Sequence, residues 1–417
     1  MARALDVYIG EDITGQLLQD DGGQMSFTYA EGWLKKPGAT PLSQSLPLQA
    51  ETFKGKECRG FFGGILPEQA KREIIARNLG ISSRNDYAML ERIGGECAGA
   101  VTFVPAGGAL PEKTYDYRKL TDKELAGILR ELPKRPLLAG DKGVRLSLAG
   151  AQDKVAVRIE GGEVSVPLGG APSTHILKPA VERFEGVVFN EALCMKLAAR
   201  AGLPAAAVET RTVDGIDFLV VERYDRLHGK SADGKPTLER LHQEDFCQAL
   251  GFVSEMKYQA EGGPSLKQCF ALLRDVSSAP VIDLARLLDA VIFNYLVGNN
   301  DAHGKNYSLL YKPLEKGGRE TRFSPLYDIV STVYYPDLSR DMAMKIGKEY
   351  SSERITARDF EQLAEEAGLG KPLVRRRVPE LADTVIQSLP KVEIANATAD
   401  KVAALIRERC EKARSFA

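Results

Sequence analysis

The sequence predicts an α+β fold in which a β-rich lobe is followed by an all-helical lobe, with a small N-terminal α/β subdomain in front of both. Strand-like runs dominate residues 143–225, whereas the chain turns to helical periodicity after about residue 240. Residues 1–104 alternate short strand-like runs with turns. A β-rich lobe followed by a helical lobe indicates a two-lobed catalytic core.

Length and composition indicate a multidomain globular protein. The chain has 417 residues, which at roughly 150 residues per domain suggests about two or three domains. Hydrophobic residues make up 44% and charged residues 27%, as in ordinary globular proteins. The net charge of −1 argues against a protein built mainly around nucleic acid.

The cysteines and the apolar runs indicate the compartment. The six cysteines are far apart and none forms a C-x-x-C pair, so we expect buried free thiols of a reducing cytosol and no zinc cluster. The start, MARALDVYIGEDITG, reads as a strand and a turn and not as a signal peptide. No apolar run reaches about 18 residues. We therefore expect a cytoplasmic protein without a membrane partner.

The N-terminal subdomain is predicted over residues 1–104. Its strand-like runs are ALDVYIG, QMSFTYA and GAVTFVP, and PEQAKREIIARNLG reads as a helix closed by a glycine. Residues 105–142 read as a linker and a helix, because Pro and Gly in PAGGALPEK (105–113) interrupt both periodicities.

The β-rich lobe is predicted over residues 143–240. RLSLAGAQDKVAV reads as a hairpin with a small-residue turn, and THILKPA and IDFLVVERYDR read as further strands. One helix, VFNEALCMKLAARAGLP, interrupts them. It is predicted to begin at an Asn190 cap and to end at Gly202 and Pro204.

The helical lobe is predicted over residues 241–417. In LARLLDAVIFNYLVG, six residues share one helix face and form a stripe that faces a core: Leu284, Leu287, Leu288, Val291, Ile292 and Tyr295. The tail from Thr356 onward is rich in Ala, Leu, Glu, Lys and Arg, which favours packed helices.

A polar run, VGNNDAHGKNYSLL (297–310), follows that stripe directly and leads into a strand-like run. Asp301 and Asn306 lie five residues apart in it. Phosphoryl transfer from ATP needs a carboxylate near the acceptor hydroxyl and an oxygen ligand for Mg²⁺, and protein kinases place an Asp and an Asn at this spacing. The pattern D-x-x-x-x-N also arises by chance, so a polar loop without chemistry remains the alternative.

Two further residues fit a nucleotide site. Asp328, in FSPLYDIVS, follows the polar run by one hairpin, where kinases carry a metal-binding aspartate, although an Asp that caps the next element is the alternative. Lys178, in STHILKPA, would pair with phosphates and with Glu191 of the next helix, or else reach solvent. Glu191 would otherwise only favour its helix N-terminus.

Weaker signals surround these. The turn Ala149–Gln152 would let backbone N–H groups approach phosphates, although it matches no established phosphate-loop motif. The backbone of Glu222–Tyr224 could bind adenine, and a buried strand that ends at a solvated surface is the alternative. His303 reads as a hydrogen-bonding loop residue, because no two histidines are spaced for a metal. Lys305 would touch the transferred phosphate or be solvated.

Eight ordered segments resemble the HipA serine/threonine kinases, the toxin half of HipBA toxin–antitoxin modules. They are RLSLAGAQDK, THILKP, FNEALCMKLAARAGL, VVERYDR, LHQEDFCQALG, KYQAEGGPS, GNNDAHGKNYSLL and PLYDIVS. SQSLPLQ, FFGGILPE and IGGECAGAVTFVP look like the small N-terminal domain of that family. The resemblance covers nearly the whole chain and implies a two-lobed, protein-kinase-like core.

The resemblance implies roles for single residues. Asp301 would be the catalytic aspartate, and Asn306 and Asp328 would hold Mg²⁺. ATP would be bound by a loop of six residues, by phosphate-binding side chains and by the adenine segment: Ala149, Gly150, Ala151, Gln152, Asp153 and Lys154; Lys178, His303 and Lys305; Glu222, Arg223 and Tyr224. Ser147 matches the serine that such kinases autophosphorylate, and a phosphate there would eject the loop and switch the kinase off. Without the resemblance, Ser147 would be interpreted as a strand serine bonded to backbone.

The resemblance also implies partners. They are a small helix-turn-helix antitoxin of the HipB type, operator DNA bound through that antitoxin, and a protein substrate of the aminoacyl-tRNA synthetase kind, whose inactivation stops translation and favours dormancy. Asp301, Asn306 and Asp328 are all present, so we expect an active kinase, although Ala302 stands where relatives often have Gly. The alternatives are a small-molecule kinase and a catalytically idle co-repressor scaffold.

Overall fold

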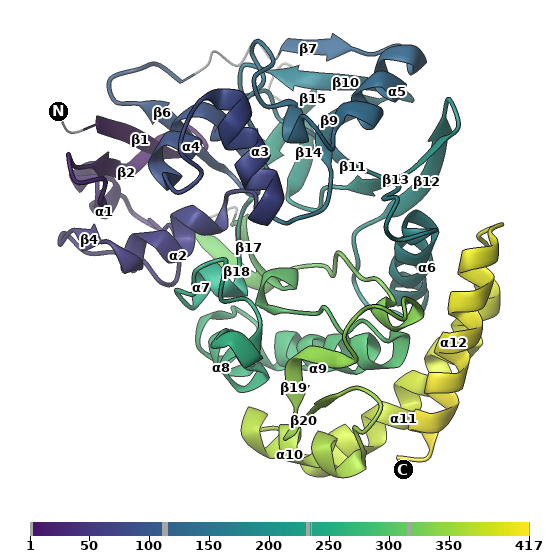
Figure 1. Ribbon diagram of the computed structural model, residues 1–417. Coiled ribbons are helices and arrows are strands. Elements are labelled where there is room, and N and C mark those ends of the chain that lie inside the picture. The colour runs from purple at the N-terminus through teal and green to yellow at the C-terminus, as the bar shows by residue number, and fades with distance from the viewer. Residues whose placement is uncertain (1–2, 111–115, 231–233, 235, 315–317, 417) are drawn as a thin grey trace. The chain divides into compact units, whose positions relative to one another are not determined.

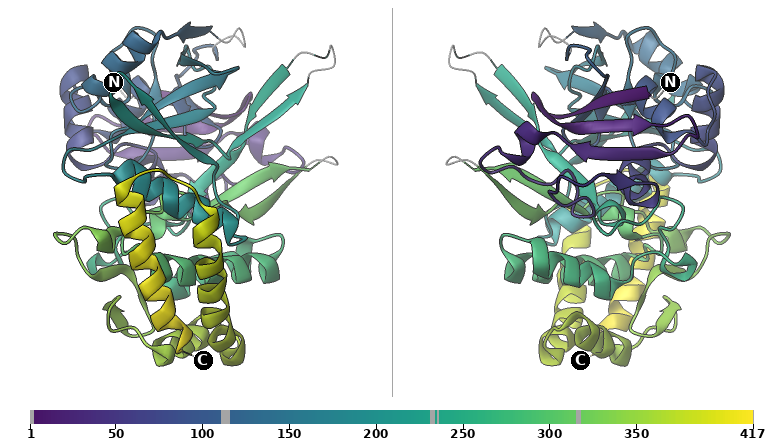
Figure 2. Two further views of the ribbon diagram at one scale, coloured as in Figure 1. Left: turned by 90° about the vertical axis from the view of Figure 1, so that its right-hand side faces the viewer. Right: turned by 90° about the vertical axis from the view of Figure 1, so that its left-hand side faces the viewer.

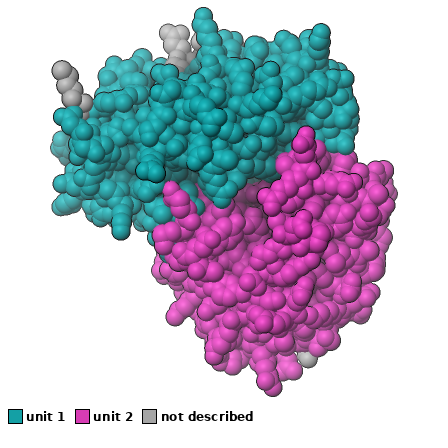
Figure 3. Space-filling view, viewed as in Figure 1, with its two compact units in different colours: residues 1–179, 211–254, 310–320 teal, residues 180–210, 255–309, 321–417 magenta. Residues whose placement is uncertain are grey.

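The computed structural model describes residues 3–110, 116–230, 234, 236–314 and 318–416 (Figure 1). It divides into two compact units (Figure 3). Unit 1 comprises residues 1–179, 211–254 and 310–320, and unit 2 comprises residues 180–210, 255–309 and 321–417. The chain passes from one unit to the other after Pro179, after Ser254, and within β12 (Val208–Val213), β17 (Ser308–Pro313) and β18 (Arg319–Phe323).

The N-terminal part of unit 1 is an antiparallel sheet in the order β4-β3-β2-β1-β6. Its strands are β1 (Arg3–Ile9), β2 (Asp12–Gln19), β3 (Met25–Tyr29), β4 (Phe53–Lys54) and β6 (Val101–Pro105). Leu5 pairs with Leu17, which pairs with Phe27, and all three are fully buried. Because opposite residues share a face, this register collects large apolar side chains on one side of the sheet.

Helices accompany this sheet: α1 (Glu31–Leu34), α2 (Lys56–Gly64), α3 (Gln69–Leu79) and α4 (Asp86–Ile93). Phe61 and Phe62 of α2 are buried in the same core, and Phe62 packs against Phe27 with ring centroids 5.4 Å apart. The predicted helix ends as expected at Gly80, which takes the left-handed conformation. The predicted strands 4–10, 24–30 and 99–105 are confirmed, and β2 was not predicted.

The second sheet of unit 1 has the order β12-β13-β11-β9-β10-β7. Its other strands are β7 (Asp116–Lys119), β9 (Val155–Glu160), β10 (Glu163–Leu168), β11 (His175–Pro179) and β13 (Ile216–Glu222), and α5 (Asp122–Glu131) follows β7. The strands β14 (Arg226–Lys230) and β15 (Pro236–Arg240) form a hairpin that extends outward in Figure 2. The unit also holds β16 (His242–Asp245) and α7 (Phe246–Ala249).

The predicted hairpin over residues 145–157 is wrong. Its first strand, β8 (Leu146–Ser147), pairs in parallel with β5 (Glu96–Cys97) of the N-terminal part, whereas β9 pairs with β10 and β11. Periodicity identifies a strand but not its partner, and Gly150, at φ +103°, redirects the chain between β8 and β9. The phosphate-loop candidate is therefore a connection between two different sheets.

Unit 2 is built on helices α6 (Val187–Arg200), α8 (Leu266–Val276), α9 (Pro280–Val297), α10 (Ala357–Ala367), α11 (Lys371–Ser388) and α12 (Ala397–Arg414). The last two lie side by side in Figures 1 and 2. The α+β class is confirmed, and the helical lobe carries in addition a hairpin of β19 (Asp341–Ile346) and β20 (Glu349–Ser351).

The predicted start of α6 is wrong. The helix begins at Val187, after Gly186, so that Asn190 lies inside it instead of capping it. The Asn190 side chain bonds to the backbone of Ser331. Its Nδ2 donates to the Ser331 carbonyl at 3.0 Å, and its Oδ1 accepts from the Ser331 N–H at 2.8 Å. A tertiary contact therefore uses the side chain that the sequence assigned to a cap.

The state of the cysteines is as predicted, since all six are buried free thiols. Among the described residues, no helix has the length and apolar character that crossing a bilayer requires. Residues 111–113 of the predicted linker lie outside the described residues. The boundaries after residues 104, 142 and 240 stay predictions.

Candidate active site

The polar run that follows α9 begins at a glycine that the packing requires. Gly298 ends α9 in the left-handed conformation, at φ +71°. A side chain there would collide with Val333. The chain can therefore turn sharply from the buried helix into the residues that carry the predicted chemistry.

Backbone and amide groups fix the shape of the loop 299–306. Asn299 Oδ1 accepts from the backbone N–H of Asp301 at 3.2 Å, and Asn299 Nδ2 donates to Asn294 Oδ1 at 2.8 Å. The backbone N–H of His303 donates to the Asp301 carbonyl at 2.8 Å. Asn306 Nδ2 reaches the same carbonyl at 3.3 Å. The five-residue spacing seen in the sequence thus becomes one compact turn that joins Asp301 to Asn306.

The Asp301 carboxylate is exposed, whereas the other predicted residues of the loop are buried, with 6% exposure for His303, 7% for Lys305 and 8% for Asn306. The Tyr258 hydroxyl donates a hydrogen bond to Asp301 Oδ1 at a distance of 2.7 Å. The Tyr258 ring also packs edge-on against His303, with centroids 5.3 Å apart. KYQAEGGPS is one of the segments that resemble the HipA family, but sequence reasoning assigned Tyr258 no role, because nothing in the local sequence links it to Asp301.

Tyr327 is a second residue that sequence reasoning missed, and its hydroxyl contacts the loop 299–306. Tyr327 donates its hydroxyl to the Lys305 carbonyl at 2.8 Å and lies 2.6 Å from Ser308 Oγ. Tyr327 directly precedes Asp328. The loop and the predicted metal-binding segment are therefore linked by one side chain.

Asp328 occupies a conformation that non-glycine residues seldom adopt. Its φ is +59°, and its side chain is half-buried. Asp tolerates the left-handed region better than most residues, and such conformations persist where surrounding contacts enforce them. Here Leu326 exchanges backbone bonds with Pro204 and Ala206, and Asn190 holds Ser331 on the other side.

A metal would find oxygen ligands on these residues. Asn306 and Asp328 offer an amide and a carboxylate, the hard oxygen ligands that Mg²⁺ prefers, and Mg²⁺ needs few protein ligands because it keeps several waters. Among the residues that the structure describes, no cluster of three or more His, Cys, Asp or Glu side chains forms a denser metal site. The donor set fits Mg²⁺ bound together with phosphates.

The predicted phosphate loop of unit 1 is tied to the N-terminal part of that unit. Gly150 forms a bridge with Pro67, and its carbonyl accepts from the backbone N–H of Glu68 at 3.4 Å. Asp153 forms an ion pair with Lys71 at 2.5 Å. Lys154 Nζ donates to the Ala149 carbonyl at 2.8 Å within the loop. The loop is therefore held at both ends by groups outside the predicted motif.

Ser147 is completely buried at the start of this connection. Its Oγ donates to the Ile65 carbonyl at 3.0 Å, and its residue pairs with Cys97 in the β5–β8 ladder. A kinase could reach this hydroxyl only after β8 had left β5.

The predicted adenine segment, residues 222–224, ends β13. Glu222 is exposed and Tyr224 half-buried, while the Arg223 side chain is buried. The backbone N–H of Arg223 donates to the Thr174 carbonyl at 2.9 Å, which extends the pairing of β13 with β11. That amide is therefore occupied, so adenine would have to use other backbone groups of the segment.

Lys178 lies on β11 opposite Leu219, and its exposure is 6%. Lysine is seldom this buried unless its charge is paired. Glu191 lies on α6 in unit 2 and is 1% exposed. Their pairing stays a prediction.

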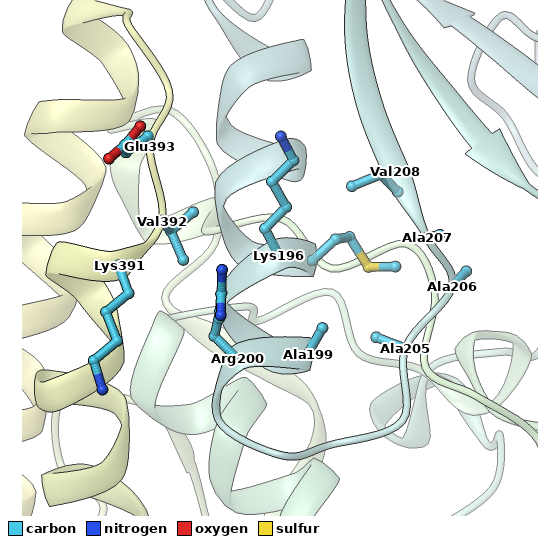
Figure 4. A pocket seen from close by; sticks show the side chains of 11 residues that line it. Lys196, Ala199, Arg200, Ala205, Ala206, Ala207, Val208, Lys391, Val392 and Glu393 are labelled. Atoms are coloured by element: carbon cyan, nitrogen blue, oxygen red, sulfur yellow. The ribbon is translucent and has the colours of Figure 1, made fainter.

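A hollow of about 760 Å³ in unit 2 does not belong to this site. It lies between the C-terminal half of α6, residues 205–208 and residues 391–393 (Figure 4). None of the predicted site residues lines it.

The chain matches two family models. The HipA N-terminal domain matches residues 5–104, and the HipA-like C-terminal domain matches residues 146–392.

Relatives and one solved structure agree with these matches. A Sinorhizobium fredii protein named as a kinase, Y4mE, is 49% identical over 94% of this chain and 92% of its own. The serine/threonine-protein kinase toxin HipA of Shewanella oneidensis is 31% identical over 93% and 90% of the two chains. A structure of the Shewanella oneidensis HipA, HipB and operator DNA complex superimposes with a TM-score of 0.84 and 29% identity, covering 98% of this chain and 97% of that chain.

Proposed function

Because this chain belongs to the HipA family of serine/threonine kinase toxins, we propose that it transfers the terminal phosphoryl group of ATP to a serine or threonine of a protein. The observation that carries the proposal is the loop 299–306. Asp301 is its exposed carboxylate, and Asn306 and Asp328 lie on segments that Tyr327 links. Kinase chemistry needs little more of the protein than such positioned carboxylate, amide and cationic groups.

Each residue has a proposed task in that reaction. Asp301 orients the acceptor hydroxyl and takes its proton as the phosphoryl group is transferred. Asn306 and Asp328 bind Mg²⁺, which when bound neutralises charge on the phosphates. Lys178, His303 and Lys305 contact the phosphates, and two backbone segments bind the remaining parts of ATP: residues 149–154 the phosphates and residues 222–224 the adenine.

Regulation is proposed to act through Ser147. Phosphate on its buried Oγ would bring about two negative charges into a site with no room for them, so β8 would detach and the loop 149–154 would lose its anchor. Autophosphorylation would then inactivate the kinase. The burial of Ser147 supports this, because the modified residue cannot keep its present place.

A similar solved structure supports the proposed antitoxin and DNA partners. The similar Shewanella structure contains HipB and operator DNA, so we propose a HipB-type antitoxin for this chain and operator binding, with co-repression, through the antitoxin. The proposed substrate is a protein of the aminoacyl-tRNA synthetase kind, whose inactivation would halt translation and favour persistence.

A phosphoryl-transfer assay with labelled ATP and Mg²⁺ tests the proposal. Wild type is compared with Asp301→Asn and with Asp337→Asn, a matched change at an exposed aspartate of unit 2. We expect label on Ser147 in wild type and in Asp337→Asn, and a loss of at least about 1,000-fold in Asp301→Asn with ATP binding retained.

The other outcomes separate the alternatives. ATP binding without any protein label, but with label on metabolites, would replace the proposal by a small-molecule kinase. An absence of ATP binding would leave a co-repressor scaffold.

A further inference from the structure

A buried charge cluster joins the N-terminal part of unit 1 to the predicted adenine segment. We call it the Glu96 cluster, and its members are Glu96, Ser173, Arg223, Asp225, Arg226 and Arg240. None of these residues belongs to the predicted catalytic or metal-binding groups, and Glu96 lies far from the adenine segment in sequence.

Glu96 is the centre of the cluster. Its Oε1 accepts from Arg223 Nη1 at 3.1 Å, from Ser173 Oγ at 3.2 Å and from Arg226 Nη2. Glu96 has no exposed surface. Its carboxylate therefore has no alternative partners in water, and its orientation is set by these donors.

Asp225 completes the connection. It accepts from Arg223 Nη2 at 2.8 Å and from the backbone N–H of Gly99 at 2.8 Å. Arg223 Nη2 also donates to the Cys97 carbonyl at 3.1 Å. The two residues that flank Tyr224 are thus both bonded to the turn 96–99 of the N-terminal part.

The ionisation of Glu96 and Asp225 also supports their role in linking the turn 96–99 to the predicted adenine segment. Burial by itself raises the pKa values of Glu96 and Asp225, but the neighbouring arginines outweigh it and lower both. Both carboxylates are therefore ionised at neutral pH. Removing one of them leaves arginines buried without their counter-charge, which destabilises the present arrangement of the cluster.

We propose that Glu96 is a positioning residue for adenine recognition. Through its bonds to Arg223 and Arg226 it fixes the backbone of residues 222–224, so that this segment meets the base in one geometry. The N-terminal part of unit 1 thereby supports nucleotide selection. This inference rests on the proposed function, in which that segment binds adenine.

The ratio of ATP to GTP affinity tells whether the Glu96 cluster positions the adenine segment or only stabilises the fold. A backbone edge that recognises adenine rejects guanine, because the donor and acceptor groups of the two bases are exchanged there and remain unpaired. A cluster that only stabilises the fold would change the melting temperature without changing the ratio of ATP to GTP affinity. A cluster that positions the segment would change that ratio.

The experiment measures dissociation constants of Mg·ATP and Mg·GTP and the melting temperature of the full chain. In Glu96→Gln we expect ATP affinity to fall by about tenfold, which equals about 1.4 kcal/mol, while GTP affinity changes little. The matched control is Asp86→Asn. Asp86 is also a buried carboxylate of the N-terminal part, but it pairs with Arg59 and Arg72 of that part alone.

A milder variant keeps the test decisive if Glu96→Gln does not fold. Ser173→Ala removes an uncharged link, since Ser173 Oγ accepts from Arg223 Nη1 at 2.9 Å. We expect it to reduce the preference for ATP over GTP by about threefold with a small change in melting temperature.

Two results would overturn the inference in distinguishable ways. If Glu96→Gln and Ser173→Ala kept the ATP preference of Asp86→Asn and wild type, the Glu96 cluster would be purely structural while the proposed function stood. If wild type bound no ATP, the proposed function would fail, and this inference would fail with it.

Discussion

At the residue scale, the bond from Tyr258 to Asp301 is a contact of the loop 299–306 that local sequence does not indicate. The exposed Asp301 carboxylate would otherwise rotate freely, and the Tyr258 hydroxyl holds one of its oxygens at 2.7 Å. A general base works best when it is oriented before its substrate arrives. If Asp301 is the general base, we therefore expect Tyr258 to act on it as a positioning residue.

We expect Tyr258→Phe to lower kcat for phosphoryl transfer by about threefold to tenfold, with little change in KM for ATP. The control is Tyr334→Phe, since the Tyr334 hydroxyl makes no hydrogen bond within the described part of the chain. Steady-state kinetics over a range of ATP concentrations decides it. Equal kcat values for the two variants would contradict the positioning role.

Glu244 supplies a pH dependence at the same scale. Burial raises its pKa from the usual 4.5 to about 7, although Ser43, Tyr311 and Gln44 bond to it and oppose the shift. The folded protein therefore holds this proton more tightly than the unfolded chain. The free energy of unfolding should fall as pH rises from about 4.5 to about 7, by at most about 1.4 kcal/mol per pH unit from this group.

Urea denaturation between about pH 5 and about pH 8 measures this slope. In Glu244→Gln, which cannot titrate, the fall in stability over that range should be smaller than in wild type. An unchanged slope would show that other groups carry it.

At the element scale, α6 is fastened to the segment that carries Asp328. Asn190 bonds to both backbone groups of Ser331 from inside the helix, and it is fully buried. Removing the amide leaves two buried backbone groups without partners. Each buried backbone group that loses its hydrogen-bond partner lowers the free energy of unfolding by about 1–3 kcal/mol.

We expect Asn190→Ala to lower the free energy of unfolding by about 2–4 kcal/mol and to weaken phosphoryl transfer through a displaced Asp328. Asn78→Ala is the matched change at an exposed asparagine that bonds to the Lys134 carbonyl, and it should cost less than about 1 kcal/mol. Chemical denaturation of both variants makes the comparison. Equal losses would mean that the α6 contact has no special weight.

The strand β8 is the other element with a testable role. It has two residues and pairs only with β5 among the described strands, so its attachment is weak compared with that of β9. The charge of Ser147→Glu cannot be accommodated at a fully buried position. We expect this variant to release residues 147–154 to proteolysis and to lose ATP binding, whereas Ser147→Ala keeps both. Limited proteolysis with mass spectrometry would detect the new cleavage, and a protected loop would contradict the expectation.

At the scale of the whole molecule, the proposed binding of ATP and Mg²⁺ is coupled to folding. Residues 149–154, Lys178 and residues 222–224 are proposed for ATP, and Asn306 and Asp328 are proposed for Mg²⁺. A ligand that binds only the folded chain stabilises it by mass action. ATP should therefore stabilise this chain in a manner that depends on Mg²⁺.

We expect Mg·ATP at a hundred times its dissociation constant to stabilise the wild type by about 2.7 kcal/mol, with less stabilisation when EDTA removes Mg²⁺. Asp328→Asn should make the two conditions equal, and Asp337→Asn should behave as wild type. Thermal denaturation measures all three proteins. An undiminished Mg²⁺ effect in Asp328→Asn would exclude this carboxylate as a metal ligand.

The sequence by itself determined the elements with strong local signals. The apolar stripe over residues 284–295 made α9 predictable, and Gly80 marked the end of α3, because periodicity and a helix-ending glycine are local signals. The five-residue spacing of Asp301 and Asn306 brought both into one turn. The ordered motifs identified the family, because eight in order rarely coincide by chance.

Only the tertiary structure decided which of these elements meet. It gave β8 to β5 instead of β9, used Asn190 as a link to Ser331 instead of a cap, and brought Tyr258 to Asp301 and Glu96 to Arg223. Strand partners and side-chain bonds between distant residues depend on packing, and no local pattern encodes them. The candidate catalytic and metal-binding residues could therefore be predicted from the sequence, whereas the contacts that support them are seen only in the folded chain.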